Sequence, residues 1–141
     1  NSTRKELSSQ LLDTFAAVVK TSPWPVGVSL HPRYLSANGE TPGFAKDLSS
    51  IGINELIIMA YTTKAEVLVN KVNSSMLTLK DFPHLHISIA QSFEKSEPTS
   101  VSHFSESREE ISVFLQHVTI NLPPQIEGLV IQNFEDYISK K

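Results

Sequence analysis

The sequence contains no cysteine, so disulfide bonds, thiol nucleophiles and thiolate metal ligands are excluded. Glycine is scarce, with 5 residues in 141, and neither a GxGxxG turn nor a P-loop occurs, so no nucleotide cofactor is predicted. There is no run of basic residues, and the net charge of -3 gives no electrostatic reason to expect nucleic acid or an anionic membrane as a partner. The longest apolar run is far too short to cross a bilayer.

The composition indicates a folded globular chain. Hydrophobic residues make up 40% of the sequence and charged residues 19%, which is typical of a protein with a packed core rather than of a disordered one. The length suits one domain, so we expect residues 1–141 to form a single α/β unit. The lack of cysteine does not fix the cellular compartment.

Four short apolar runs predict the strands. Runs of this length without alternation are typical of strands buried on both faces, as in a parallel sheet. The clearest run ends at Tyr61 and is followed within a few residues by a helix signal. The four predicted strands are Val26–Leu30, Leu56–Ala60, Leu85–Ala90 and Leu129–Gln132.

Helices are predicted before, between and after these strands. Ser/Thr-x-x-Glu capping boxes, which mark helix starts, occur at Thr3, Thr63 and Ser107. The segment from Ser92 to Ser105 is polar and has no clear period, so it is predicted to be a long loop. Trp24, between two prolines, is interpreted as a packing anchor below the sheet. The predicted helices run from Thr3 to about Lys20, over Phe44–Ile51, from Thr63 to Leu77, from Ser107 to before Pro123, and over Phe134–Ser139.

Two architectures fit four consecutive βα units. One is strands five to eight, the carboxyl-terminal half, of a (β/α)8 barrel, whose full length is typically ~250 residues. The other is an open, doubly wound, flavodoxin-like sheet. The half-barrel would leave two unpaired strand edges and one exposed face. We therefore expect it to associate with a second copy or with the missing half of the barrel.

Polar residues directly after the strands are the candidates for a ligand site. In a parallel α/β protein the carboxyl ends of the strands meet at one face, where a tyrosine ring and amide side chains could hold a polyhydroxylated ligand. Polar residues also cap strands in proteins without such a site. The candidate ligand-binding residues are Tyr61, Gln91, Gln132 and Asn133, with Arg33 at the rim.

Catalytic and metal-binding signals are sparse. Glu94 and Glu135 are the carboxylates nearest the predicted face, and glycoside hydrolysis usually needs two, roughly 5 to 9.5 Å apart. A solvated surface position is the alternative for both. His84 and His86 lie at the opposite end of their strand, and no His-x-x-x-His pair occurs, so no zinc site is predicted. No Gly-x-Ser-x-Gly nucleophile elbow is present.

The strand ends resemble those of the chitinase-like glycoside hydrolase barrels. Leu56–Tyr61 resembles the Met-x-Tyr strand of that family, which is its sixth strand. Ile87–Ser92, followed by Ser102–Ser105, is similar to the seventh strand and loop, and Ile126–Tyr137 resembles the last strand. Val26–Tyr34 would then be the fifth strand.

This resemblance implies a saccharide site at which Tyr61 lines the sugar. Thr62 stands where the family often has an acidic residue, and nothing in this chain matches the carboxylate motif of the family's fourth strand. The resemblance therefore implies that the main catalytic acid lies outside this chain, which alone would be inactive. The alternative is a noncatalytic carbohydrate-binding or regulatory module. A secreted or cell-surface location would follow from the glycoside hydrolase resemblance.

Overall fold

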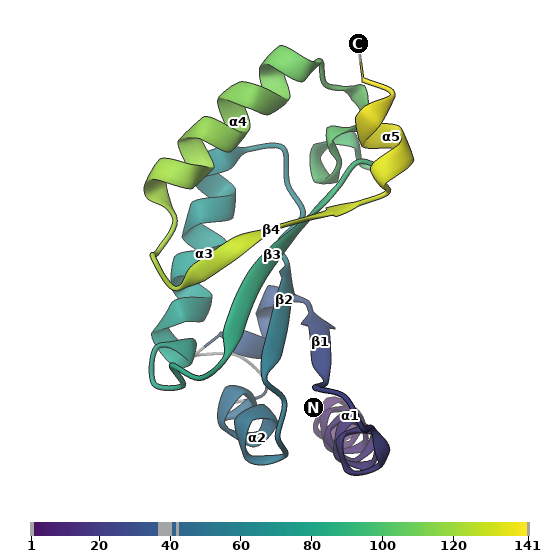
Figure 1. Cartoon of the computed structure of the whole chain (residues 1–141), viewed down its shortest axis with the longest axis vertical. Helices are drawn as coiled ribbons and strands as arrows, with labels where there is room; N and C mark the ends of the chain where they lie inside the picture. The colour runs from purple at the N-terminus through teal and green to yellow at the C-terminus, as the bar shows by residue number, and fades with distance from the viewer. Residues whose placement is uncertain (1, 37–40, 42, 141) are drawn as a thin grey trace.

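The computed structural model describes residues 2–36, 41 and 43–140, and it contains one four-stranded sheet with its connecting helices (Figure 1). The sequence predicts a loop from Ser36 to Pro42, on its Asn-Gly and Pro-Gly pairs, and most of that segment lies outside the described residues. The elements in chain order are α1 (Ser2–Thr21), β1 (Gly27–Leu30), the 3-10 helix η1 (Pro32–Leu35), α2 (Phe44–Ser50), β2 (Glu55–Met59), α3 (Ala65–Leu79), β3 (His86–Ser92), the 3-10 helices η2 (Thr99–Val101) and η3 (His103–Ser105), α4 (Arg108–Asn121), β4 (Ile126–Gln132) and α5 (Phe134–Ile138).

The sheet is parallel throughout, which confirms the predicted α/β class. Its strands follow one another in sequence order, β1-β2-β3-β4, and each pair of neighbours is parallel. A flavodoxin-like sheet has the order 2-1-3-4-5. The flavodoxin-like alternative is therefore wrong for this chain.

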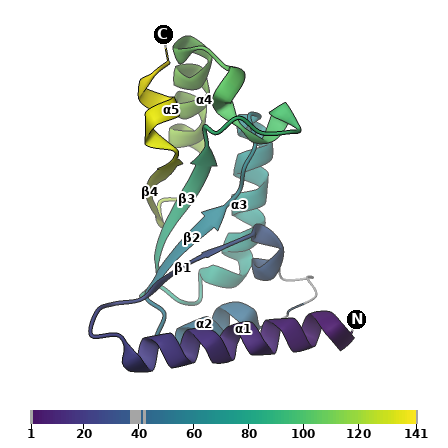
Figure 2. The same ribbon diagram turned by 90° about the vertical axis from the view of Figure 1, so that its right-hand side faces the viewer.

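The helices of the described chain leave one face of the sheet open. Helices α3 and α4 pack side by side against the other face, while α1 and α2 lie across the amino ends of the strands (Figures 1 and 2). The turn after α2 comes close to α1, since a Cβ on Gly52 would lie 3.2 Å from Cγ1 of Val19. No described helix is both long and apolar enough to cross a membrane.

The core lies between the sheet and the helices α3 and α4. Leu56 and Ile58 of β2 point toward these helices and are fully buried, as are Leu68 and Val72 of α3. Burying each such side chain contributes about 1.5–3 kcal/mol to stability. The residues between them on β2 face the open side and remain partly exposed. The expectation that these strands are buried on both faces is wrong for β1, β2 and β4, and it is confirmed only at the end of β3, where Ala90, Gln91 and Ser92 are all buried.

The three predicted capping boxes have different outcomes. Ser107 caps α4 as predicted, because its hydroxyl accepts from the Glu110 backbone while the Glu110 carboxylate accepts from the Ser107 backbone. The other two predictions are wrong. Thr3 lies inside α1, which begins at Ser2. Helix α3 begins after Lys64, which has no side-chain cap, and Thr63 bonds instead to the carbonyl of Ser100.

The predicted packing role of Trp24 is also wrong. Its side chain is 76% exposed, and its backbone N–H donates to the hydroxyl of Ser22 in the turn that leads from α1 to β1. The prolines on either side explain the local sequence, since they end the helix and set an extended approach to the strand.

Candidate functional site

Tyr61 and Gln132 meet at the carboxyl ends of the strands. Tyr61 follows β2, Gln132 is the last residue of β4, and the tyrosine hydroxyl donates to Oε1 of the glutamine. Strand β3 lies between their strands, and Gln132 pairs with Ser92 at the end of β3. The two side chains are 71 positions apart in sequence, so the fold alone brings them together.

Glu94 is the third member of this cluster. Burial, and second the charge of Glu94, raise the pKa of the Tyr61 hydroxyl above its usual 10.0. The backbone around Glu94 is held by two serines, since its N–H donates to Ser92 Oγ at 3.4 Å and its carbonyl accepts from Ser102 Oγ at 2.5 Å. The carboxylate itself is exposed. The strand ends thus present a phenol, an amide and one carboxylate, which we call the Tyr61 cluster: Tyr61, Glu94 and Gln132.

Asn133 and Glu135 lie beside the cluster at the start of α5. Asn133 has φ 64°, in the left-handed region that asparagine tolerates better than most residues, and its Oδ1 accepts from the backbone N–H of Asp136. Its carboxamide oxygen is therefore already used to cap α5. Glu135 is exposed in the first turn of that helix. No contact joins Glu135 to Glu94 among the described residues, so the structure does not assemble them as an acid pair.

The structure places Gln91 away from the Tyr61 cluster, contrary to its predicted role. It is only 2% exposed, and its Nε2 donates to the carbonyls of Ala60 at 3.2 Å and Ala90 at 2.8 Å. Alternation along β3 explains this, because the neighbouring Ser92 and Ala90 belong to the open face and Gln91 points to the helix face. A ligand at the strand ends cannot reach its amide without opening the core.

Arg33 is likewise not at the rim of the cluster. Its guanidinium lies over the ring of Tyr34, with Cζ 5.1 Å from the ring centroid, and Nη2 donates to the Tyr34 hydroxyl at 3.4 Å. It lines a cleft against Lys71 and its neighbours in α3. The reason is the 3-10 turn η1, which folds the residues after β1 back toward α3.

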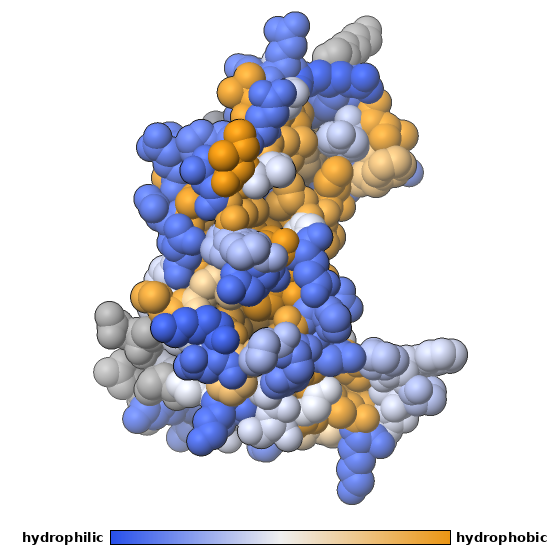
Figure 3. Space-filling model, turned by 60° about the vertical axis from the view of Figure 1, so that its left-hand side comes forward, coloured by the Kyte–Doolittle hydropathy of each residue, from blue (hydrophilic) through white to orange (hydrophobic). Residues whose placement is uncertain are grey.

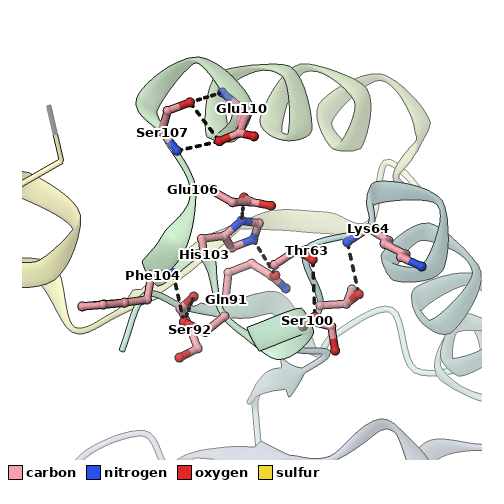
Figure 4. A network of polar contacts seen from close by, with 12 residues as sticks. Thr63, Lys64, Gln91, Ser92, Ser100, His103, Phe104, Glu106, Ser107 and Glu110 are labelled. Carbon is pink, nitrogen blue, oxygen red and sulfur yellow. Dashed lines mark hydrogen bonds and ion pairs between the residues drawn. The ribbon is translucent and has the colours of Figure 1, made fainter. Parts of the chain in front are cut away.

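A buried network around His103 was not predicted from the sequence (Figure 4). His103 is 1% exposed, and its ring stacks on Phe93 and meets Phe114 edge-on. Its Nδ1 lies 2.5 Å from a carboxylate oxygen of Glu106, and its Nε2 lies 3.4 Å from Oε1 of Gln91. Both ring nitrogens therefore face oxygen acceptors.

This network fixes the connection between β3 and α4, which includes Glu94. The hydroxyl of Ser102 donates to the carbonyls of Ser92 and Glu94, and the N–H of Thr63 donates to the carbonyl of Ser100. The segment predicted as a long loop thus contains two 3-10 turns and buried side chains. Phe93 and the pair Ser102-His103 were the residues in the sequence that could have indicated that this segment is ordered.

The network contains serine, histidine and glutamate, the residue types of a hydrolytic triad, but not its geometry. The Ser102 hydroxyl donates to backbone carbonyls, and the His103 nitrogen that would activate a nucleophile faces the amide oxygen of Gln91. With the imidazole buried, no substrate can approach it. The network is structural, and it supports the backbone on which Glu94 is carried.

Metal ligands do not gather in the described part of the chain. No group of three or more histidine, aspartate or glutamate side chains there could hold an ion. His86 pairs with Glu127 at 2.7 Å at the amino end of the sheet, next to the register shift between β3 and β4. His84 hydrogen-bonds to Ser49 at 2.9 Å instead of joining the pair of His86 and Glu127.

Comparisons with known proteins give no further information on family or function. No protein-family model matches the chain, no curated protein matches it, and no solved structure matches its fold.

Proposed function

We propose that the chain forms four consecutive βα units of a barrel that resembles the chitinase-like glycoside hydrolases, and that its Tyr61 cluster binds a saccharide. The sequential parallel order of the strands supports the barrel, as does the one-sided placement of α3 and α4 (Figure 2). In a barrel, the open face of the sheet would become the interior. Met59, Ala90 and Val130, which are register partners on β2, β3 and β4, lie on that face and would face the interior.

The observation that carries the ligand proposal is the contact between Tyr61 and Gln132. The contact places an aromatic ring and an amide from two different strands at the carboxyl end of a parallel sheet, where α/β proteins bind ligands. An aromatic ring offers a sugar a large apolar surface, and the amide nitrogen of Gln132, whose oxygen accepts from Tyr61, offers it donors. Glu94 adds an acceptor for sugar hydroxyls beside them.

The same cluster favours binding over hydrolysis by this chain alone. Glu94 is the one carboxylate that acts on Tyr61 among the described residues, and Glu135 belongs to the first turn of α5 without contact to it. Because glycoside hydrolysis generally needs two carboxyl groups across the scissile bond, a second acid would have to come from outside this chain. A noncatalytic carbohydrate-binding or regulatory module is the second candidate, and the isolated carboxylate is the observation that favours it.

The open edge of β4 supports association with a second copy. A monomeric protein of this length exposes about 7,300 Å², so the 8680 Å² of this chain is roughly 1,400 Å² above that expectation. Val130 and Ile131 point to opposite faces of β4, yet both are more than one-third exposed. Figure 3 shows hydrophobic side chains reaching the surface across the middle of the molecule. The excess is larger than the area that one partner buries in a standard protein interface, about 800 Å².

The β4 edge is better suited to pairing than the β1 edge. Strand β1 has four residues and is followed by Pro32, and short edges with nearby proline resist pairing. Strand β4 has seven residues, contains no proline or lysine, and carries only Glu127 as a charge. Ile120 on α4, which is 80% exposed and outside this strand, provides a matched control position for an edge variant.

Calorimetric titration with chitin, cellulose and starch oligosaccharides tests the ligand proposal. Wild type should bind at least one of these series, and Tyr61→Ala should weaken that binding by about 1–3 kcal/mol. Tyr61→Phe keeps the ring but loses the hydroxyl, so it should cost less, about 0.5–1.5 kcal/mol. Tyr34→Phe removes a hydroxyl in η1, outside the cluster, and should bind as wild type does.

Thermal unfolding recorded beside each titration separates lost binding from lost folding. If folded Tyr61→Ala binds as tightly as wild type, the site lies elsewhere on the chain. If wild type binds none of the three oligosaccharide series, the saccharide proposal fails for this chain.

A further inference from the structure

A cleft between η1 and the middle of α3 is separate from the Tyr61 cluster. Its volume is about 400 Å³, and no residue of the Tyr61 cluster lines it. The η1 wall of the cleft is tied to α3, because the backbone carbonyl of the buried Leu35 accepts a hydrogen bond from the hydroxyl of Thr78 at 2.6 Å. The polar side chains that line the cleft are those of His31, Arg33, Ser36, Asn70, Lys71, Ser74 and Ser75.

The charged side chains that line this cleft are basic. Arg33 and Lys71 line it, and none of the described residues that line it is acidic. Neither cation has a carboxylate within ion-pair distance among the described residues, whose ion pairs join other side chains. Burial, and then the charges of Arg33 and Lys71, lower the pKa of His31, so all three groups act on the same space.

The orientation of these groups suits an anion. The backbone N–H of Arg33 donates to Nδ1 of His31 at 3.2 Å, so a neutral imidazole carries its proton on Nε2 and can donate from there. The ring of Tyr34 lies under the Arg33 guanidinium and restrains its plane. A restrained guanidinium forms paired hydrogen bonds to phosphate and sulfate oxygens, and the lysine adds a point charge.

We propose that this cleft binds a tetrahedral oxyanion, of the kind carried by a phosphate or sulfate monoester. Arg33 would supply the paired donors, Lys71 the second charge and His31 a further N–H. The serine hydroxyls of the cleft would complete the donors, and the bound anion would relieve the mutual repulsion of the two cations. This site does not depend on a saccharide at the Tyr61 cluster.

The test is a titration of the whole chain with sodium phosphate and, separately, sodium sulfate, at fixed pH and fixed ionic strength. The NMR signals of the His31 ring report the result. Sodium acetate forms a third arm, because a planar carboxylate has the charge without the tetrahedral shape. Both tetrahedral anions should give saturable shifts, and acetate should bind more weakly. A pH series recorded with and without saturating phosphate should give a higher pKa for His31 when phosphate is bound.

Variants identify the groups responsible. Arg33→Gln and Lys71→Gln should each weaken phosphate binding by about tenfold or more. Lys64→Gln removes an exposed charge at the N-cap of α3, outside the cleft, and should leave binding unchanged. Equal weakening by Lys64→Gln, or shifts that do not saturate, would mean general charge screening and would overturn the proposal. Stronger binding of acetate than of phosphate would overturn the tetrahedral preference.

Discussion

Replacing Gln91 by leucine tests whether the buried network holds the strand ends in place. The change keeps the side chain about the same size and removes both hydrogen bonds from Nε2 to backbone carbonyls. It also removes the polar partner of Nε2 of His103, in a ring that is 1% exposed. The variant therefore isolates the polar contribution of Gln91 from its packing.

The expected cost follows from these contacts. Each lost hydrogen bond is worth about 0.5–1.5 kcal/mol, and an unpaired buried donor costs about 1–3 kcal/mol. Because the contact between His103 and Gln91 is long at 3.4 Å, we expect the lower part of the combined range, about 2–3 kcal/mol. That is a large share of the 5–15 kcal/mol by which whole domains are typically stable.

Urea unfolding followed by circular dichroism measures this loss, and thermal unfolding gives the companion shift in Tm. Gln116→Leu is the matched control, because Gln116 is exposed on α4 and its replacement should change stability by no more than about 0.5 kcal/mol. A double variant with His103→Leu should cost less than the two single changes combined, since they share one network. If Gln91→Leu is as stable as wild type, the network does not hold the strand ends.

Three further predictions concern titration and association. Glu94→Gln should lower the raised pKa of Tyr61 but leave it above 10.0, because burial is the larger cause, and an NMR titration can measure the change. The stability linked to the Tyr61 hydroxyl is present below pH 10 and is lost as the pH rises through the raised pKa. Hydrogen bonds from Ser107 lower the pKa of Glu110. The stability linked to that carboxylate is therefore present above pH 4.5, its usual pKa, and is lost as the pH falls through the lowered pKa. Ser107→Ala should return the pKa of Glu110 toward 4.5 and fray the start of α4. Ile131→Lys should convert a dimer, detected by light scattering, into a monomer, whereas the control Ile120→Lys on α4 should remain a dimer. A wild type that is monomeric at all concentrations would contradict the pairing of β4.

The sequence predicted the sheet well because its strand signals are local. Each apolar run is short, bounded by turn residues and separated from the next by a helix signal, so the strand positions and the parallel class follow from residues close in sequence. The order of the strands did not follow in this way, since a sequential and a flavodoxin-like order both fitted the sequence. The capping box at Ser107 is confirmed for the same reason. At Thr63 the local pattern was present but the threonine bonds to Ser100 instead, a tertiary contact that no short motif reveals.

The candidate site was predictable only in part, because side-chain direction depends on register and on neighbouring turns. Tyr61 and Gln132 meet as their strand-end positions suggested. Gln91 follows the same rule of position but points to the helix face, and Arg33 is carried away by the 3-10 turn. The buried environment of His103 arises from aromatic neighbours on separate segments, which periodicity cannot show.

The most direct test of the saccharide site is a chemical-shift map of the whole chain during titration with the oligosaccharide that binds tightest. The largest shifts should fall at the carboxyl ends of β2 and β4 and at Glu94, and at the same oligosaccharide concentration they should be smaller in Tyr61→Ala. Gln91 and the amino ends of the strands should change little. Largest shifts at the amino ends, or an unchanged pattern in folded Tyr61→Ala, would contradict the Tyr61 cluster as the binding site.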